Sequence, residues 1–529
     1  MSDPKFPRSG DLSSRESSRQ LSCLKSRSNL EATGDFSFST ENWALAMEYY
    51  GRAIQEEEPS SGDQWRLSFK MGESLRRKGL YQEAGEFFTR SLALLEDSRT
   101  GVERALLLDR LGSVQMNTGH PEEGLRSCFQ AYELIRDSKH HSEVAEVLNR
   151  IAITYMRLGY PREAREFFLD ALATFRRVNH SLGICCCYTN LGLLAKNACR
   201  FEEALELSHK GLEIAREHSL YKWQLNLQLN MGIILFKMHR DREASRRFQR
   251  ARRLARRCGE ESLLVSSTLS LGRVQARLGH HQRAEAFLLE GKARAERNGQ
   301  KRSAVLADEF LGELAWFRGD LRAAESNFRS ALADAEILAP RGDLVVEVLQ
   351  RLSSLLQDLG REGESLLLAE RGLKLAELNG ELYEIPFLLW TRARATASLG
   401  DRSVALTGYR DSLRAFEKSR NPVSGRKARY DFSRFLMESG SQEDLLRARK
   451  ILDRLLASAR EEHSEEEIFQ ASLLMAGVEA GLGSLEGARL ALMDAEAACL
   501  GDPSSGKRSK LEELRSILEL PPPSAEACH

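Results

Sequence analysis

The sequence predicts an all-α solenoid, a stack of about eleven or twelve helical hairpins in which each hairpin contacts only its neighbours. The first observation is a large residue followed by glycine, with the glycines at positions 72, 112, 192, 232, 272 and 312. These positions are 40 residues apart, or 80 where Ile151-Ala152 replaces the pair. A single globular core does not repeat at such a fixed interval, so the period indicates stacked units.

A turn residue is the second observation. Seven residues after each pair, a glycine or a substitute is expected to end the first helix, because glycine adopts positive φ without a Cβ penalty. The expected turn positions are Gly79, Gly119, Gly159, Cys199, His239, Gly279, Gly319, Gly360, Gly400, Gly440 and Gly483. Pro121 and Pro161 are placed to begin second helices, where the missing N–H costs nothing.

The third observation is a small–large–small pattern in each second helix. It is present in Ala164-Phe168-Ala171, Ala244-Phe248-Ala251 and Ala324-Phe328-Ala331. Small residues let helix backbones approach closely, and the aromatic ring fills the space between them. Most repeating positions are therefore interpreted as packing positions.

The solenoid is expected to occupy residues 35–500. Residues 1–34 are rich in Ser and Arg and are predicted to be disordered. The first helical face carries Ala46, Tyr50 and Ala53. A short helix in 501–520 is predicted to cap the open apolar end, and residues 521–529 are predicted to form a disordered tail.

Composition restricts the partners. Lys plus Arg and Asp plus Glu both number 77, so there is no global field towards nucleic acid or an anionic membrane, and neither is an expected partner. One exception is the arginine-dense segment Arg240–Arg257, which is either a patch for phosphate or acidic protein or a solvated outer face. No apolar run approaches the ~18 residues of a membrane span, and no secretory signal is visible. Nine cysteines without a CxxC motif are interpreted as reduced thiols in a cytoplasmic protein.

Catalytic and cofactor motifs are not found. Gly481, Gly483 and Gly487 nearly match a dinucleotide loop, but no strand precedes them. Cys185–Cys187 lack the paired spacing of a zinc site. The protein is therefore expected to be no enzyme and to hold no cofactor or metal.

Taken together, these repeats resemble the tetratricopeptide repeat (TPR) family, over roughly residues 36–500. The unit with Met71-Gly72, Gly79, Tyr81, Ala84 and Phe88 matches the family pattern closely. The usual period is about 34 residues, and the six extra residues are expected to lengthen both helices. Asn before the Leu-Gly or Met-Gly pair resembles a long-period branch that includes Leu-Gly-Asn polarity adaptors, kinesin light chains and the sensor arrays of maltose-activator-type bacterial regulators. The resemblance implies a right-handed superhelix whose concave groove is lined by the first helix of each hairpin.

Carried over residue by residue, that geometry predicts a groove lined by fourteen side chains, which we call the wall residues. They are Arg76, Arg77, Asn117, Asn149, Arg157, Asn190, Lys196, Asn226, Asn230, Lys237, Arg273, Arg277, Trp316 and Trp390. Up to about residue 280 they are Asn and cations, which suit a peptide backbone and ligand carboxylates. Beyond it the groove turns acidic and aromatic, with Glu309, Glu313 and Glu347 near the two tryptophans. A solvated polar wall is the alternative interpretation of the cations, and packing between repeats that of the tryptophans.

The predicted function is a protein–protein interaction scaffold or adaptor that captures a peptide or partner segment, an acidic one if the cations select it, in the groove. The alternative is a sensor array of a bacterial signalling or transcription-control system that acts through a separate output protein.

Overall fold

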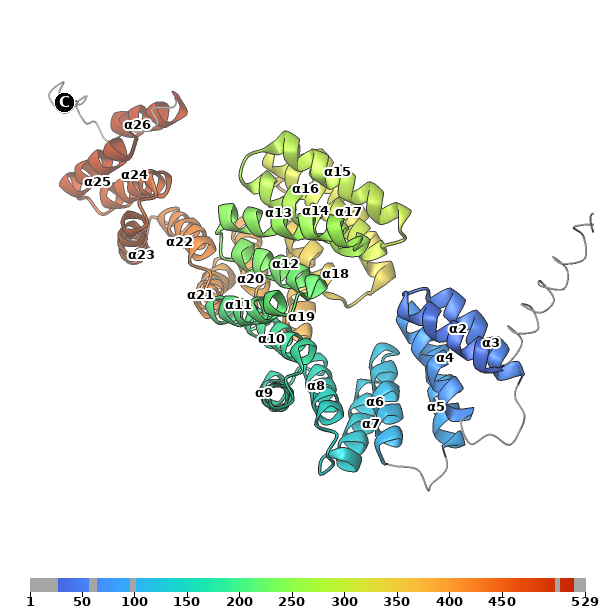
Figure 1. Ribbon diagram of the computed structural model, residues 1–529. Coiled ribbons are helices and arrows are strands. Elements are labelled where there is room, and N and C mark those ends of the chain that lie inside the picture. The colour runs from blue at the N-terminus through green and yellow to red at the C-terminus, as the bar shows by residue number, and fades with distance from the viewer. Residues whose placement is uncertain (1–26, 57–63, 96–100, 500–504, 518–529) are drawn as a thin grey trace, which may run out of the picture. The chain divides into compact units, whose positions relative to one another are not determined.

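The computed structural model describes residues 27–56, 64–95, 101–499 and 505–517, and within these ranges it forms 25 helices and no strand (Figure 1). Taken in order, the first 24 helices make up twelve hairpins, each with a first helix A and a second helix B. The predicted all-α solenoid of about eleven or twelve hairpins is confirmed.

The A helices are α2 (Arg27–Ser39), α4 (Gln64–Lys78), α6 (Gly101–Asn117), α8 (His141–Arg157), α10 (Ser181–Asn197), α12 (Tyr221–Lys237), α14 (Glu261–Arg277), α16 (Lys301–Phe317), α18 (Asp343–Asp358), α20 (Ile385–Ser398), α22 (Pro422–Met437) and α24 (Glu465–Gly481). The B helices are α3 (Trp43–Gln55), α5 (Tyr81–Leu94), α7 (Pro121–Ile135), α9 (Pro161–Arg177), α11 (Phe201–Glu217), α13 (Asp241–Cys258), α15 (His281–Arg297), α17 (Leu321–Leu338), α19 (Glu362–Asn379), α21 (Arg402–Lys418), α23 (Gln442–Glu461) and α25 (Leu485–Cys499).

The period of 40 residues follows from the lengths of the helices. In the central hairpins both helices have 17 residues, as in α8 and α9, and three-residue connections join them. At 1.5 Å per residue such a helix is roughly 25 Å long. The six residues beyond the usual period therefore lengthen the helices, as predicted.

Positive φ marks both kinds of connection. All eleven predicted turn positions adopt it, including Cys199 (55°) and His239 (59°), where a side chain replaces glycine. The connections from B to the next A use it too, for example at Asn179, Ser219 and Gly259. The sequence analysis did not identify this second set, because most of its members are not glycine.

In three of the repeated pairs the glycine lies beneath a phenylalanine of helix B. A Cβ atom placed on Gly72, Gly232 or Gly312 would lie 2.8, 2.4 or 2.7 Å from the ring of the B-helix phenylalanine. Those rings, Phe88, Phe248 and Phe328, are at most 2% exposed. The contact leaves no room for a side chain, which explains why this position is small in repeat after repeat.

At the N-terminal end the predicted boundary is wrong. Helix α2 begins at Arg27, so residues 27–34 of the segment predicted to be disordered are helical. Leu30 is fully buried, and Gly34 packs against Tyr50 as the pair glycines pack against phenylalanine. Ser28, Thr33, Ser37 and Ser39 hide this helix from a search for apolar periodicity. The remainder of the predicted segment lies outside the described residues.

At the C-terminal end a helix lies within the predicted capping range. Helix α26 (Ser505–Ile517) places Leu511 against Phe469 of α24 and Leu492 of α25. The predicted tail, 521–529, lies outside the described residues.

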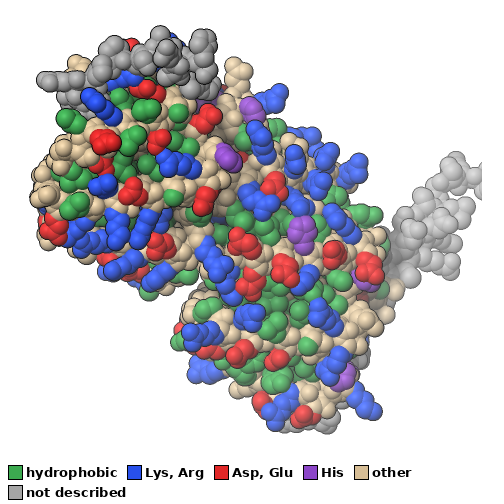
Figure 2. All heavy atoms as spheres, turned by 90° about the vertical axis from the view of Figure 1, so that its left-hand side faces the viewer, with side chains coloured by type: hydrophobic (Ala, Val, Ile, Leu, Met, Phe, Trp, Pro, Cys, Tyr) green, Lys and Arg blue, Asp and Glu red, His purple; other side chains and the backbone are tan. Residues whose placement is uncertain are grey.

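The chain divides into two compact units. Unit 1 runs to Leu194 and includes Leu207–Trp223; unit 2 comprises Ala195–Glu206 and the chain from Gln224 onward. Side chains of both charges intermingle over the face shown in Figure 2. No helix of the described ranges is long and apolar enough to cross a membrane.

Candidate functional site

In unit 1 the wall residues of neighbouring hairpins contact one another. Arg157 Nη1 donates to Asn117 Oδ1 at 3.2 Å, and Asn190 Nδ2 donates to Asn149 Oδ1 at 3.1 Å. The members of each pair lie 40 or 41 positions apart, so equivalent positions of adjacent A helices lie side by side. The asparagines expected to bind a peptide backbone are therefore partly hydrogen-bonded to other wall residues.

The arginines near the start of the wall differ in exposure. Arg76 donates two 2.9 Å hydrogen bonds to the carboxylate of Glu73, which is itself buried. Arg77 is exposed and lies 5.9 Å from the centre of the Trp43 ring.

In unit 2 the predicted basic track is paired with the acidic track within the chain. Arg273 on α14 donates to both carboxylate oxygens of Glu313 on α16, at 2.8 and 2.7 Å. Arg277 bonds Asp241 and lies 3.4 Å from the centre of the Phe236 ring. These cations are ion-paired and half-buried, so the expectation that they await a ligand carboxylate is corrected for both.

Lys237 joins hairpins that lie far apart in the sequence. Its Nζ is 3.5 Å from Glu384 Oε1 and 3.6 Å from the centre of the Tyr383 ring, across 147 positions. Burial disfavours its charge, but Glu384, Tyr383 and Glu347 together outweigh burial, and the pKa of Lys237 is raised. Neighbouring Lys196 has its pKa lowered, first by burial and then by Lys237. Both lysines therefore belong to an interior charge network.

The centre of this network is a pair of glutamates beside Arg351, Glu309 buried and Glu313 half-buried. Glu309 is fully buried, and its Oε1 lies 3.0 Å from Arg351 Nε. Burial raises the pKa of Glu309, whereas Arg273 and Arg351 overcome the burial of Glu313 and lower its pKa. Of the predicted acidic stretch, Glu309 is thus interior, and Glu313 and Glu347 are half-buried.

Asn226 and Asn230 are half-buried on α12. The two tryptophans bond to carboxylates in the next hairpin. Trp316 Nε1 donates to Asp358 at 3.1 Å, and Trp390 Nε1 donates to Asp431 at 3.0 Å. These indoles link repeats through their N–H groups. Trp390 also lines a pocket, and its N–H is hydrogen-bonded to Asp431.

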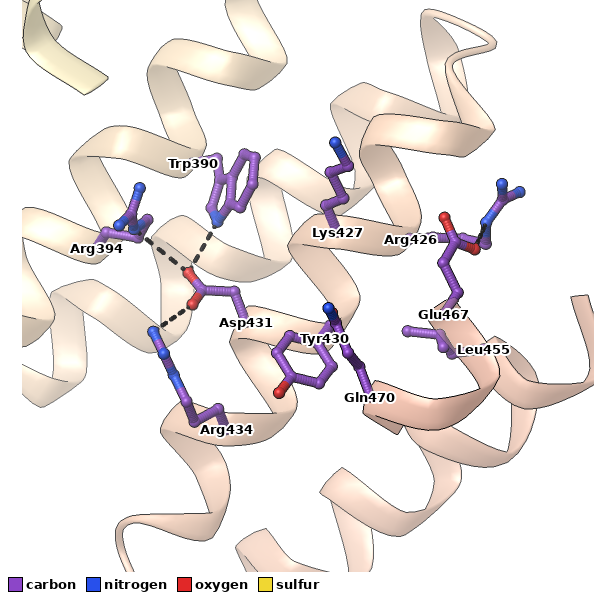
Figure 3. Close-up of a pocket in the computed structure, with 10 residues that line it drawn as sticks. All are labelled: Trp390, Arg394, Arg426, Lys427, Tyr430, Asp431, Arg434, Leu455, Glu467 and Gln470. Carbon is purple, nitrogen blue, oxygen red and sulfur yellow. Dashed lines mark hydrogen bonds and ion pairs between the residues drawn. The ribbon is translucent and has the colours of Figure 1, made fainter. Parts of the chain in front are cut away.

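That pocket has a volume of about 300 Å³ and is formed by A helices α20, α22 and α24 with one residue of α23 (Figure 3). Its apolar lining is Trp390, Tyr430 and Leu455. Its polar lining is Arg394, Arg426, Lys427, Asp431, Arg434, Glu467 and Gln470. We call it the α20–α24 pocket.

Asp431 organises one side of the α20–α24 pocket. Besides the Trp390 indole, it accepts from Tyr409 Oη at 3.1 Å and from Arg434 at 2.7 Å, and Arg394 Nε is 3.6 Å away. Arg394 has a second carboxylate partner, since its Nη2 donates to Asp358 at 3.2 Å, and Arg434 remains exposed. Figure 3 shows Arg394, Arg434 and the indole of Trp390 converging on Asp431.

The other side carries an uncompensated cation. Arg426 is bound by Glu462, with two bonds of 2.6 Å, and by Glu467 at 2.6 Å. Lys427 is exposed and has no ion-pair partner among the described residues. Four cations and two carboxylates line the pocket. Asp358 and Glu462, outside the lining, pair with Arg394 and Arg426. Lys427 is therefore left to suit a ligand carboxylate next to an apolar group.

Sequence reasoning found only Trp390 of this lining. The hairpins of α22 and α24 depart from the 40-residue register, so groove positions could not be carried over to them. The i, i+4 pair Trp390–Arg394 on α20 was the available signal, since such residues share one helix face.

The described residues hold no group of three or more His, Cys, Asp or Glu side chains arranged for a metal ion. Their seven cysteines are all free thiols.

The central hairpins of the chain match the tetratricopeptide-repeat family. A model of the tetratricopeptide repeat matches residues 143–217 and 223–297, which are α8–α11 and α12–α15. The same hairpin geometry continues on both sides of the matched residues. No curated protein matches the sequence.

Among solved structures, the apo form of the quorum sensor NprR from B. thuringiensis is similar, with a TM-score of 0.50 and 14% identity over 66% of this chain and 98% of that one. The apo form of RapI has a TM-score of 0.49 and 16% identity, over 67% and 97%. A Rap protein complexed with competence and sporulation factor has a TM-score of 0.47 and 14% identity, over 74% and 98%. At these identities the likeness to NprR concerns the fold alone.

Proposed function

We propose that this protein is an interaction scaffold that captures an extended segment of a partner protein along its A helices. The α20–α24 pocket anchors that segment. Repeat arrays present continuous surfaces for such segments, and binding is spread over several hairpins. The supporting observation is the combination of an apolar floor with cations that the chain itself neutralises only in part.

The chemistry of the pocket specifies the anchor. Lys427 and Arg434 offer charge to a carboxylate, and the faces of Trp390 and Tyr430 offer apolar contact. A segment with Asp or Glu next to a large apolar residue satisfies both. Aromatic and arginine side chains are the ones that contribute most at interfaces. The pocket is favoured over three wall cations of unit 2, since Lys237, Arg273 and Arg277 are already paired within the chain.

The experiment is a selection of peptides from a random display library against the full chain. The wild-type protein should enrich peptides that contain an acidic residue beside an apolar one. The variant Lys427→Glu/Arg434→Glu should lose that enrichment or shift it towards basic peptides, because the pocket changes sign.

Lys450→Glu/Arg454→Glu is the matched control. It reverses two exposed charges on B helix α23, outside the pocket lining. The control should select the same peptides as the wild type. Identical peptide profiles from the pocket variant and the control would refute the pocket as the anchor.

A further inference from the structure

Helix α13 carries a straight stripe of arginines on its exposed side. The stripe consists of Arg242, Arg246, Arg250, Arg253 and Arg257. Their spacing of four, four, three and four places them on one helix face, over roughly 22 Å. All five are exposed, and none forms an ion pair or hydrogen bond with a described residue. The ion-paired arginines of this helix, such as Arg252 and Arg256 with Glu290, lie beside the stripe.

Helix α11 carries the opposite charge at the equivalent positions. Forty residues earlier, the same spacing gives Glu202, Glu206, Lys210, Glu213 and Glu217, all exposed. Four carboxylates and one lysine thus repeat the geometry of five guanidinium groups. No other B helix of the central hairpins carries charges so predominantly of one sign at these positions. The corresponding positions of α15 are Gln282, Ala286, Glu290, Ala293 and Arg297.

We propose that the arginine stripe of α13 docks on the acidic stripe of α11 from a second copy of this chain. Charge complementarity carries the assignment, because both stripes lie on helices and their charges recur at the same interval of about 6 Å. Each copy carries one stripe of each sign, so every copy offers both partners of the contact. Arginine suits the role because its guanidinium binds carboxylates through two parallel hydrogen bonds.

Duplex DNA fits the arginine stripe less well. A strand of B-DNA completes a turn in about 34–36 Å, so it would curve away from a straight stripe of roughly 22 Å. An anionic membrane is also disfavoured. Helix α13 exposes no large apolar side chain for insertion, and the stripe is one helix wide, since α15 does not continue it.

The test measures the mass of the full chain in solution by sedimentation, with two charge-reversal variants. One is Arg246→Glu/Arg250→Glu/Arg253→Glu on α13, and the other is Glu202→Arg/Glu213→Arg/Glu217→Arg on α11. The wild type should self-associate at low salt, near 0.05 M, and dissociate towards 1 M, where the Debye length falls to about 3 Å. Each variant alone should be monomeric under the low-salt condition, with unchanged helicity by circular dichroism.

The two variants mixed in equal amounts should associate, because the acidic α13 of one then faces the basic α11 of the other. This restoration separates a lost contact from a lost fold. Lys210→Glu should tighten self-association of the wild type by about tenfold or less, the range expected for exposed pairs. A monomeric wild type, variants that still associate, or a mixture that stays monomeric would each overturn the proposal. Binding of duplex DNA by a monomeric wild type would assign the stripe to nucleic acid instead.

Discussion

His239 lies at the turn position that is glycine in most repeats, and its φ is 59°. Its ring is largely buried, and its Nε2 has no hydrogen-bond partner among the described residues. Burial, followed by the nearby charges of Arg277 and Lys427, lowers its pKa to about 4. The neutral imidazole is therefore the form that the folded state prefers.

This preference predicts a pH dependence. The ordinary pKa of histidine is 6.5, and that of His239 in the folded chain is about 4. Between these pH values His239 is protonated in the unfolded chain but neutral in the folded chain. The free energy of unfolding therefore falls as the pH falls. His239→Asn keeps a residue that tolerates positive φ and should remove about 2 kcal/mol of that loss. Urea unfolding midpoints measured across this range check it. The exposed His141→Asn variant should keep the wild-type slope, and an unchanged slope in His239→Asn would contradict the prediction.

At the scale of elements, an ion pair links Lys237, the last residue of helix α12, to Glu384, the residue just before helix α20. Lys237 and Glu384 are both largely buried, and Tyr383 lies against the ammonium group. A buried pair of this kind contributes little net stability compared with apolar residues, but each charge compensates the cost of burying the other. The link thus constrains the packing of hairpins that sequence separation would leave independent.

Glu384→Gln should therefore destabilise unit 2 by about 3–5 kcal/mol, because it leaves the charge of Lys237 buried and uncompensated. The double variant Lys237→Met/Glu384→Leu should recover most of that loss, since no buried charge remains. Urea titrations of Lys237→Met, Glu384→Leu and the double variant close the cycle. Additive losses would show that the two side chains do not act as a pair.

At the scale of the whole molecule, a repeat array unfolds through local units because each hairpin contacts mainly its neighbours. Gly312 is a probe of this behaviour, because its absent Cβ leaves room for the ring of Phe328 in unit 2. Gly363 in helix α19 of the same unit has open space around it.

Gly312→Ala should destabilise by about 1–3 kcal/mol through overpacking, and the loss should stay local. Hydrogen exchange read by mass spectrometry should show faster exchange in α16 and α17 and unchanged exchange in α6–α9 of unit 1. Gly363→Ala, the control, should gain up to about 1 kcal/mol from helix propensity. Uniformly faster exchange throughout the chain would mean that the array unfolds as one cooperative body.

The sequence by itself determined the repeating hairpin. The glycine under each phenylalanine, the eleven turns and the 17-residue helices all depend on neighbours within about 40 positions, and such local constraints leave a periodic trace. The sequence did not predict the first helix of the first hairpin, because the hydroxyl side chains of α2 obscure its apolar pattern.

Only the tertiary structure decided which polar side chains are available. Lys237 meets Glu384 across 147 positions, and Arg273 meets Glu313, so residues predicted to await a partner are neutralised inside the chain. The α20–α24 pocket likewise forms between hairpins that do not follow the 40-residue period. Charge pairing depends on distance in space, and the repeat specifies the position of a residue only relative to adjacent hairpins.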